Sequence, residues 1–160
     1  MQKIEPKPWG EQEAYNKLSA LCARQECCLS DLAVKMTKKG MDNQSIDRIL
    51  RQLEEEGFVN EERYSRAFVH DKLMFSHWGR NRIRIELRRK GIAHEIFAPA
   101  LEEINEEDYL QVLRDLLTEY RRHITAPSNH ELRNRLIRYA ISRGFEVSLA
   151  MSIVDHQEEE

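Results

Sequence analysis

The sequence has no apolar run that approaches the roughly 20 residues needed to cross a bilayer. Its N-terminus also lacks the apolar segment of a secretory signal peptide, so we expect a cytoplasmic protein. Cysteine is scarce, and no histidine or second Cys-x-x-Cys stands at a zinc-like spacing from Cys22, Cys27 and Cys28. We interpret these three residues as reduced thiols and expect neither a disulfide framework nor a metal site.

Signatures of catalysis are also missing. The sequence contains no Gly-rich phosphate loop, no Gly-x-Ser-x-Gly, no His-Glu-x-x-His and no paired carboxylates in an apolar setting. Its histidines are scattered among polar neighbours, which is typical of surface residues rather than of a general base. No convincing alternation of apolar and polar residues predicts a strand. These absences favour an all-α protein that is not an enzyme and needs no cofactor.

An internal repeat is centred on Gly40, Gly91 and Gly144, each of which follows a basic residue and precedes an apolar one. Successive glycines are 51 and 53 residues apart. Apolar residues stand eight and four positions before every glycine: Leu32 and Met36, Ile83 and Leu87, Leu136 and Ala140. This spacing predicts a buried helical stripe. Each glycine is then the expected helix end in the left-handed conformation, preceded by a cation that complements the helix dipole.

Each of these helices is flanked by two further amphipathic segments. One segment follows the glycine, beginning near Asp42, Ala93 and Phe145, and the other precedes the helix, at about 11–25, 61–75 and 106–123. Helix start signals stand at Asn105 and Ser128. The sequence therefore predicts an all-α protein, a tandem array of three three-helix units that forms an elongated, curved molecule.

The domain boundaries are predicted from the turns that join the units, at 56–58 and 103–105. We expect an N-terminal extension at 1–10, three-helix repeats at 11–57, 58–104 and 105–154, and an acidic tail at 155–160. Arrays of this kind contact partners over a long surface, and we expect the units to change orientation at their joints.

Positive charge is concentrated in the middle of the chain. The whole chain has a formal net charge of −3, yet residues 63–91 contain nine cations and two acids. The segment 80–92 is the densest part, and such a surface favours an anionic partner over a merely solvated helix. The candidate binding residues are Arg63, Arg66, Lys72, Arg80, Arg82, Arg84, Arg88, Arg89 and Lys90, with Arg133, Arg135 and Arg138 as a weaker extension in the third unit.

Four aromatic residues accompany this basic segment. Tyr64 and Phe68 have helical spacing, so we interpret them as core residues rather than as platforms that stack on bases. Phe75 and Trp78 stand near a predicted loop, where a core position and a surface anchor are both open.

Two motifs stand at a defined spacing in the middle of the chain. The first is GFVNEERYSRAFV at 57–69, and the second is WG at 78–79 followed by IRxELxxKGI at 83–92. Together they resemble the bacterial RecX regulators, and a looser match extends over about residues 12–154. The three-unit helical array predicted from the glycines agrees with the fold of that family.

The resemblance implies a non-enzymatic modulator of the RecA recombinase. Such a protein would bind the groove of the RecA filament on single-stranded DNA and lower ATP hydrolysis, strand exchange and co-protease activity. We expect a monomer whose main charged contacts come from Arg80, Arg82, Arg84, Arg88 and Arg89, with direct contact to DNA left open.

Two other classes of protein stay open. A helix-turn-helix-like DNA-binding protein would also be basic and helical, but no recognition helix or dimer seam is marked here. A helical scaffold for another protein would tolerate loss of the arginines, and its binding would depend little on salt. The chain departs from the RecX pattern at Cys27 and Cys28, where a hydroxyl cap usually precedes the second helix, so we expect Ser30 to cap that helix instead.

Overall fold

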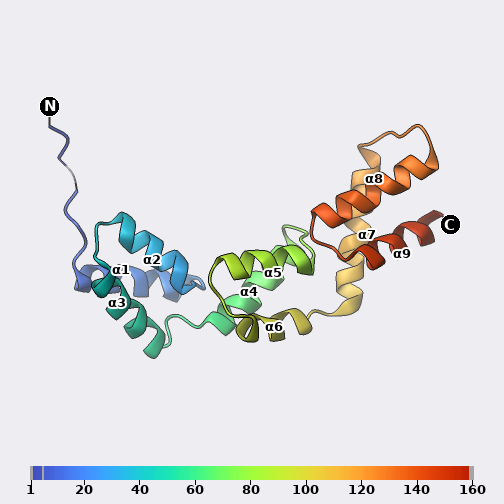
Figure 1. Cartoon of the computed structure of the whole chain (residues 1–160). Coiled ribbons are helices and arrows are strands. Elements are labelled where there is room, and N and C mark those ends of the chain that lie inside the picture. The colour runs from blue at the N-terminus through green and yellow to red at the C-terminus, as the bar shows by residue number, and fades with distance from the viewer. Residues whose placement is uncertain (1, 5, 159–160) are drawn as a thin grey trace.

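The computed structural model describes residues 2–4 and 6–158, and within these residues it contains nine α-helices and no strand. The helices form three successive groups along a curved, elongated molecule (Figure 1). This confirms the all-α fold and the tandem arrangement. The bounds are α1 Glu11–Arg24, α2 Leu29–Lys38 and α3 Asn43–Glu55 in the first unit, α4 Glu61–Met74, α5 Arg80–Arg89 and α6 His94–Glu102 in the second, and α7 Glu106–Arg122, α8 Asn129–Ser142 and α9 Val147–Glu158 in the third. Residues 155–158 of the predicted acidic tail thus continue α9, and residues 159–160 lie outside the described residues.

The three repeated glycines end α2, α5 and α8 in the same way. Gly40, Gly91 and Gly144 have φ angles of +80°, +77° and +98°. The residue after each glycine donates its N–H to a carbonyl five residues earlier, at 3.2 Å, 3.2 Å and 3.0 Å. This is the Schellman motif, in which a left-handed glycine closes the last helical turn. The prediction that a helix ends at each glycine is therefore confirmed.

Side-chain caps fix the starts of several helices. Asn105 and Ser128 accept hydrogen bonds from backbone N–H groups at the starts of α7 and α8, at 2.9 Å and 3.1 Å, which confirms both predicted start signals. Asp42 and Asn60 cap α3 and α4 in the same manner.

The predicted cap of α2 is wrong. The helix begins at Leu29, so Ser30 lies inside its first turn, and the N-cap residue Cys28 makes no side-chain cap bond. The Leu29 N–H instead lies near the carboxylate of Glu61, a residue of the second unit, and acts to lower the pKa of that carboxylate. A carboxylate of another unit therefore stands near the start of this helix, which has no hydroxyl cap of its own.

The apolar interior is divided unequally among the three units. The first unit has its own core, around Leu18, Met36 and Leu53. The second and third units share one continuous core, which includes Leu87 of α5 and Leu113 of α7, and Cys28 is the one residue of the first unit that belongs to it. The array therefore consists of a two-unit body and a first unit with a largely separate core.

The joint between the second and third units is formed where α5 begins. Its N-cap, Gly79, has no side chain, and the end of α8 supplies the acceptors instead. The Gly79 N–H donates to the Arg143 carbonyl at 2.8 Å, and the Asn81 N–H donates to the Gly144 carbonyl at 3.0 Å. A Cβ on Gly79 would lie 2.4 Å from the backbone of Gly144, so the two backbones approach this closely only because the residue is glycine.

Candidate partner-binding surface

Helix α5 presents one apolar edge to the core and a basic face to solvent. Ile83 and Leu87 are fully buried, as their helical spacing predicts. In Figure 1, α5 lies along the upper, concave side of the molecule, above α4 and α6. The cations of α5 and its neighbours divide into two sets, according to whether an acidic side chain lies against them.

Arg80 belongs to the interior of the joint and not to the exposed face. Its side chain is only 18% exposed, and its guanidinium forms ion pairs with Glu106 at 2.6 Å and Glu146 at 2.7 Å. The guanidinium also lies 3.9 Å from the ring centre of Tyr109, whose hydroxyl accepts the Arg80 backbone N–H at 3.1 Å. Burial, followed by the hydrogen bond to Glu146, raises the pKa of Tyr109, so its hydroxyl stays protonated and donates to Glu146.

Three further predicted residues of the second unit are held in ion pairs with acids. Arg63 pairs with Glu26 and Lys90 pairs with Asp31, and both pairs join the second unit to the first. Arg66 pairs with Glu103 at 3.2 Å within the second unit. These cations carry contacts of the fold itself, which leaves less of their charge for a partner.

The predicted residues of the third unit also have acidic neighbours. Arg133 binds both carboxylate oxygens of Asp155, at 2.7 Å and 3.3 Å. Arg135 and Arg138 share Glu131, at 3.4 Å and 3.8 Å. All three residues lie in the first ten residues of α8, away from the end that meets α5. Arg138 nevertheless stays 70% exposed, so its charge remains available to a partner.

Four cations of the second unit form no ion pair with any residue that the structure describes: Lys72, Arg82, Arg84 and Arg88. Arg84 donates to the Asn81 side chain at 3.0 Å, which neutralises no charge. Arg89 pairs only with Glu86, one turn away, and stays 72% exposed. Exposed pairs of this kind contribute well under about 1 kcal/mol, so Arg89 remains available to a partner. We call these four cations, together with Arg89, the basic face.

Aromatic residues of the core lie next to the basic face. Tyr64 is 9% exposed and stacks on Phe68 at 5.7 Å, and both pack in the core, as predicted. Trp78 packs partly against the core, and the cationic groups of Arg82 and Lys72 lie 4.1 Å and 4.8 Å from its ring centre. These cation–π contacts orient two of the uncompensated cations. Phe75, by contrast, is 75% exposed and lies on the surface.

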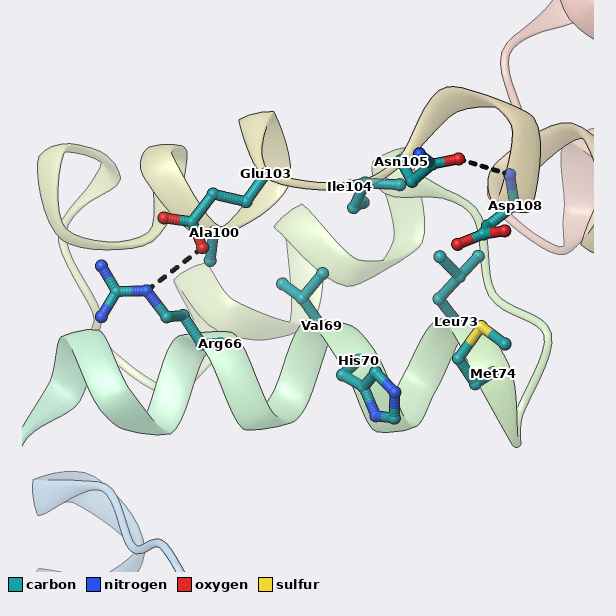
Figure 2. A pocket seen from close by; sticks show the side chains of 10 residues that line it. All are labelled: Arg66, Val69, His70, Leu73, Met74, Ala100, Glu103, Ile104, Asn105 and Asp108. Carbon is teal, nitrogen blue, oxygen red and sulfur yellow. Dashed lines mark hydrogen bonds and ion pairs between the residues drawn. The ribbon is translucent and has the colours of Figure 1, made fainter.

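A groove of about 310 Å³ lies between α4, the end of α6 and the start of α7 (Figure 2). Val69, Leu73 and Ala100 line its apolar part. Two contacts join polar groups of the groove: Arg66 pairs with Glu103, and Asn105 accepts the Asp108 N–H. This arrangement stabilises the join between α6 and α7 and offers no nucleophile with an adjacent base.

The cysteines are free and buried. Burial raises the pKa of the Cys22 thiol to about 12 and also raises that of Cys28, so both stay protonated at neutral pH and are poor nucleophiles. Within the described part of the chain, no three histidine, cysteine or acidic side chains are grouped to hold a metal ion. Among the same residues, no helix combines the length and the apolarity needed to span a membrane.

Fold and surface together define an all-helical tandem-repeat protein whose middle unit exposes a basic helix with several cations that form no ion pair among the described residues. The family model described as RecX, second three-helix domain, matches residues 60–101. The regulatory protein RecX of Mycobacterium sp. (strain KMS) is 26% identical over 151 residues, which cover 92% of this chain and 82% of that protein. The regulatory protein RecX of Clostridium perfringens (strain SM101 / Type A) is 30% identical over 127 residues, which cover 78% of this chain and 58% of that protein.

Solved structures of RecX proteins have the same fold. A crystal structure of regulatory protein RecX superposes with a TM-score of 0.82 at 20% identity, over 91% of this chain and 73% of that one. The crystal structure of RecX from Lactobacillus salivarius gives 0.79 at 17% identity, over 94% and 97%. The chain belongs to the RecX family of regulatory proteins.

Proposed function

We propose that this protein is a non-catalytic modulator of the RecA recombinase, mainly an inhibitor, that binds the groove of the RecA filament on single-stranded DNA. Its membership of the RecX family supports regulation as the function. The observation that carries the site is the set of uncompensated cations of the second unit, Lys72 in the last turn of α4 and Arg82, Arg84 and Arg88 on α5.

The physical basis of inhibition is a long molecule with several weak contact regions. An elongated, curved array lies along a helical groove and spans neighbouring subunits, so that modest contacts add through effective concentration. A filament bridged in this way is held back from the transitions that hydrolysis and strand exchange require, which lowers ATPase, strand-exchange and co-protease activity. The protein acts as a monomer in the cytoplasm, where the filament forms.

The basic face steers the protein to an acidic surface and anchors it there. Arginine forms bidentate contacts with carboxylates and phosphates, and cations without an internal ion pair cost little to redirect. Arg80 has the opposite role in this proposal, because its charge is already used by Glu106 and Glu146. We therefore assign Arg82, Arg84 and Arg88 to the partner and Arg80 to the fold.

A titration of single-stranded-DNA-dependent ATP hydrolysis by RecA tests the proposal. The wild-type protein should inhibit at substoichiometric to stoichiometric ratios, and Arg84→Glu/Arg88→Glu should weaken inhibition by at least about tenfold, because two rim charges are reversed. Arg51→Glu/Arg121→Glu is a charge-matched control, since both residues are exposed on α3 and α7, away from the basic face. Inhibition by the α5 variant that equals inhibition by the control would refute the assigned site.

A further inference from the structure

An apolar residue lies on the side of α5 that faces away from the core, in the middle of the basic face. Ile85 is 50% exposed, although isoleucine ranks among the residues most often buried. It lies two positions from Ile83 and two from Leu87, both fully buried, and two positions correspond to about 200° around a helix. Ile85 therefore points away from the core, and its exposure does not arise from an incompletely covered core edge.

Cations and one amide surround Ile85 on the helix surface. Residues three and four positions away are neighbours on a helix, and these are Asn81, Arg82, Arg88 and Arg89. Of the three arginines, Arg82 and Arg88 form no ion pair among the described residues, and Arg89 is 72% exposed. The outer surface of α5 is thus an apolar centre within a cationic rim.

The first unit also has an exposed apolar residue at the equivalent position. Val34 occupies the position of α2 that corresponds to Ile85, six residues before the repeated glycine, and it is 52% exposed. It too lies between two buried residues of the stripe, Leu32 and Met36. In the third unit, the position is occupied by Arg138. Two successive units therefore present a branched aliphatic side chain at equivalent outward positions.

We infer that Ile85 and the arginines around it form a docking surface for a protein partner, one that offers an apolar pocket rimmed by carboxylates. This inference rests on the proposed function and assigns the surface to the recombinase subunits of the filament rather than to the DNA. A phosphate backbone gains from every cation but gains nothing from a central isoleucine. Protein interfaces, by contrast, concentrate binding energy in an apolar centre enclosed by polar contacts, and arginine is enriched there.

The substitution Ile85→Lys distinguishes a protein partner from a nucleic-acid partner. The substitution adds a cation to a helix whose exposed positions tolerate lysine, so the fold is retained. It should strengthen binding to bare phosphates but place a charge in an apolar pocket. Val147→Lys is the matched control, because Val147 is also 50% exposed and lies on α9, in another unit.

Binding of fluorescently labelled wild type, Ile85→Lys and Val147→Lys is measured by anisotropy against two targets. One target is the RecA filament on single-stranded DNA with a non-hydrolysable ATP analogue, and the other is the DNA alone. We expect Ile85→Lys to lose at least about tenfold in affinity for the filament while its affinity for bare DNA is equal or higher, and Val147→Lys to match the wild type. Ile85→Lys binding the filament as tightly as the wild type overturns the inference and leaves the proposed function standing. A wild type that does not bind the filament overturns both.

Discussion

The two joints of the array place different chemical groups at the start of a helix. Helices α2 and α5 both begin without a side-chain cap of their own, at Cys28 and Gly79, and in both cases the following unit places polar groups near the helix start. For α5 the acceptors are backbone carbonyls and a buried tyrosine hydroxyl. For α2 the polar group is the Glu61 carboxylate, which lies near the Leu29 N–H. Helix α8, the corresponding helix of the third unit, has its own cap in Ser128.

This difference indicates how firmly each unit is held. The second and third units share a core, and their joint contains main-chain hydrogen bonds and an arginine that is 18% exposed. The first unit keeps a separate core, and the ion pairs of its joint, Arg63–Glu26 and Lys90–Asp31, are partly open to solvent. Exposed ion pairs are weak and screened by salt, whereas buried groups that lose their partners are costly. The array should therefore behave as a rigid two-unit body with a more loosely attached first unit.

The largest loss of stability is expected when a side chain is added at the point where the two backbones meet in the second joint. Gly79→Ala places a Cβ 2.4 Å from the Gly144 backbone and should destabilise the second and third units by roughly 2–4 kcal/mol. Gly10→Ala is the control, because Gly10 is also an uncapped N-cap with extended backbone but has nothing within 4 Å of the added Cβ. Its cost should stay below about 1 kcal/mol. Urea denaturation followed by Trp78 fluorescence, in a Trp9→Phe background, measures both values. Equal costs for the two substitutions would contradict the close approach.

A smaller difference in stability is expected between alanine substitutions of the arginines at the two joints. Arg80→Ala leaves Glu106 and Glu146 without their cation in a partly buried site and should cost roughly 2–3 kcal/mol. Arg63→Ala removes a more exposed pair with Glu26 and should cost less than about 1 kcal/mol. The same denaturation experiment tests the pair. If Arg63→Ala costs as much as Arg80→Ala, the first joint is as firm as the second.

The smallest effect is a pH dependence at the first joint. Burial, opposed by the Leu29 N–H, raises the pKa of Glu61 above its ordinary value of 4.5. The folded protein therefore binds this proton more readily than the unfolded chain, and the contribution of Glu61 to stability falls as pH rises from 4.5 through the raised pKa. Glu61→Gln removes the charge but keeps a carbonyl oxygen near the Leu29 N–H. Relative to the wild type, this variant should gain urea resistance between pH 4 and pH 7; an unchanged difference across that range would show that Glu61 does not titrate this way.

The local structure could be predicted closely from the sequence. Helix ends at Gly40, Gly91 and Gly144, and starts at Asn105 and Ser128, depend on residues within one turn, and such signals are visible in a single chain. The common spacing of the glycines then revealed the repeat, and with it the fold class.

The joints could not be predicted, because their partners are far apart in sequence. From the sequence alone, Arg80 is one more cation of a basic segment, yet its carboxylates come from positions 26 and 66 residues away. Gly79 had no visible function, since the backbone that it approaches belongs to another unit. The missing cap of α2 had a similar cause, and Ser30 was the nearest local substitute for a carboxylate that only the folded chain brings to that helix. Ile85 was different, because its position out of phase with Ile83 and Leu87 could have been recognised from helical periodicity alone.

Distance distributions across the two joints test the central claim most directly. Spin labels at Arg51→Cys and Glu95→Cys span the first joint, and labels at Glu95→Cys and Thr118→Cys span the second; all three positions are exposed, on α3, α6 and α7. The native thiols are buried, and the wild-type protein labelled in parallel controls for their reaction. We predict a broad distribution for the first pair that widens further as salt is raised to about 1 M, where exposed ion pairs are screened, and a narrow, salt-independent one for the second pair. Two distributions of equal width, unchanged by salt, would contradict the distinction between a firm and a loose joint.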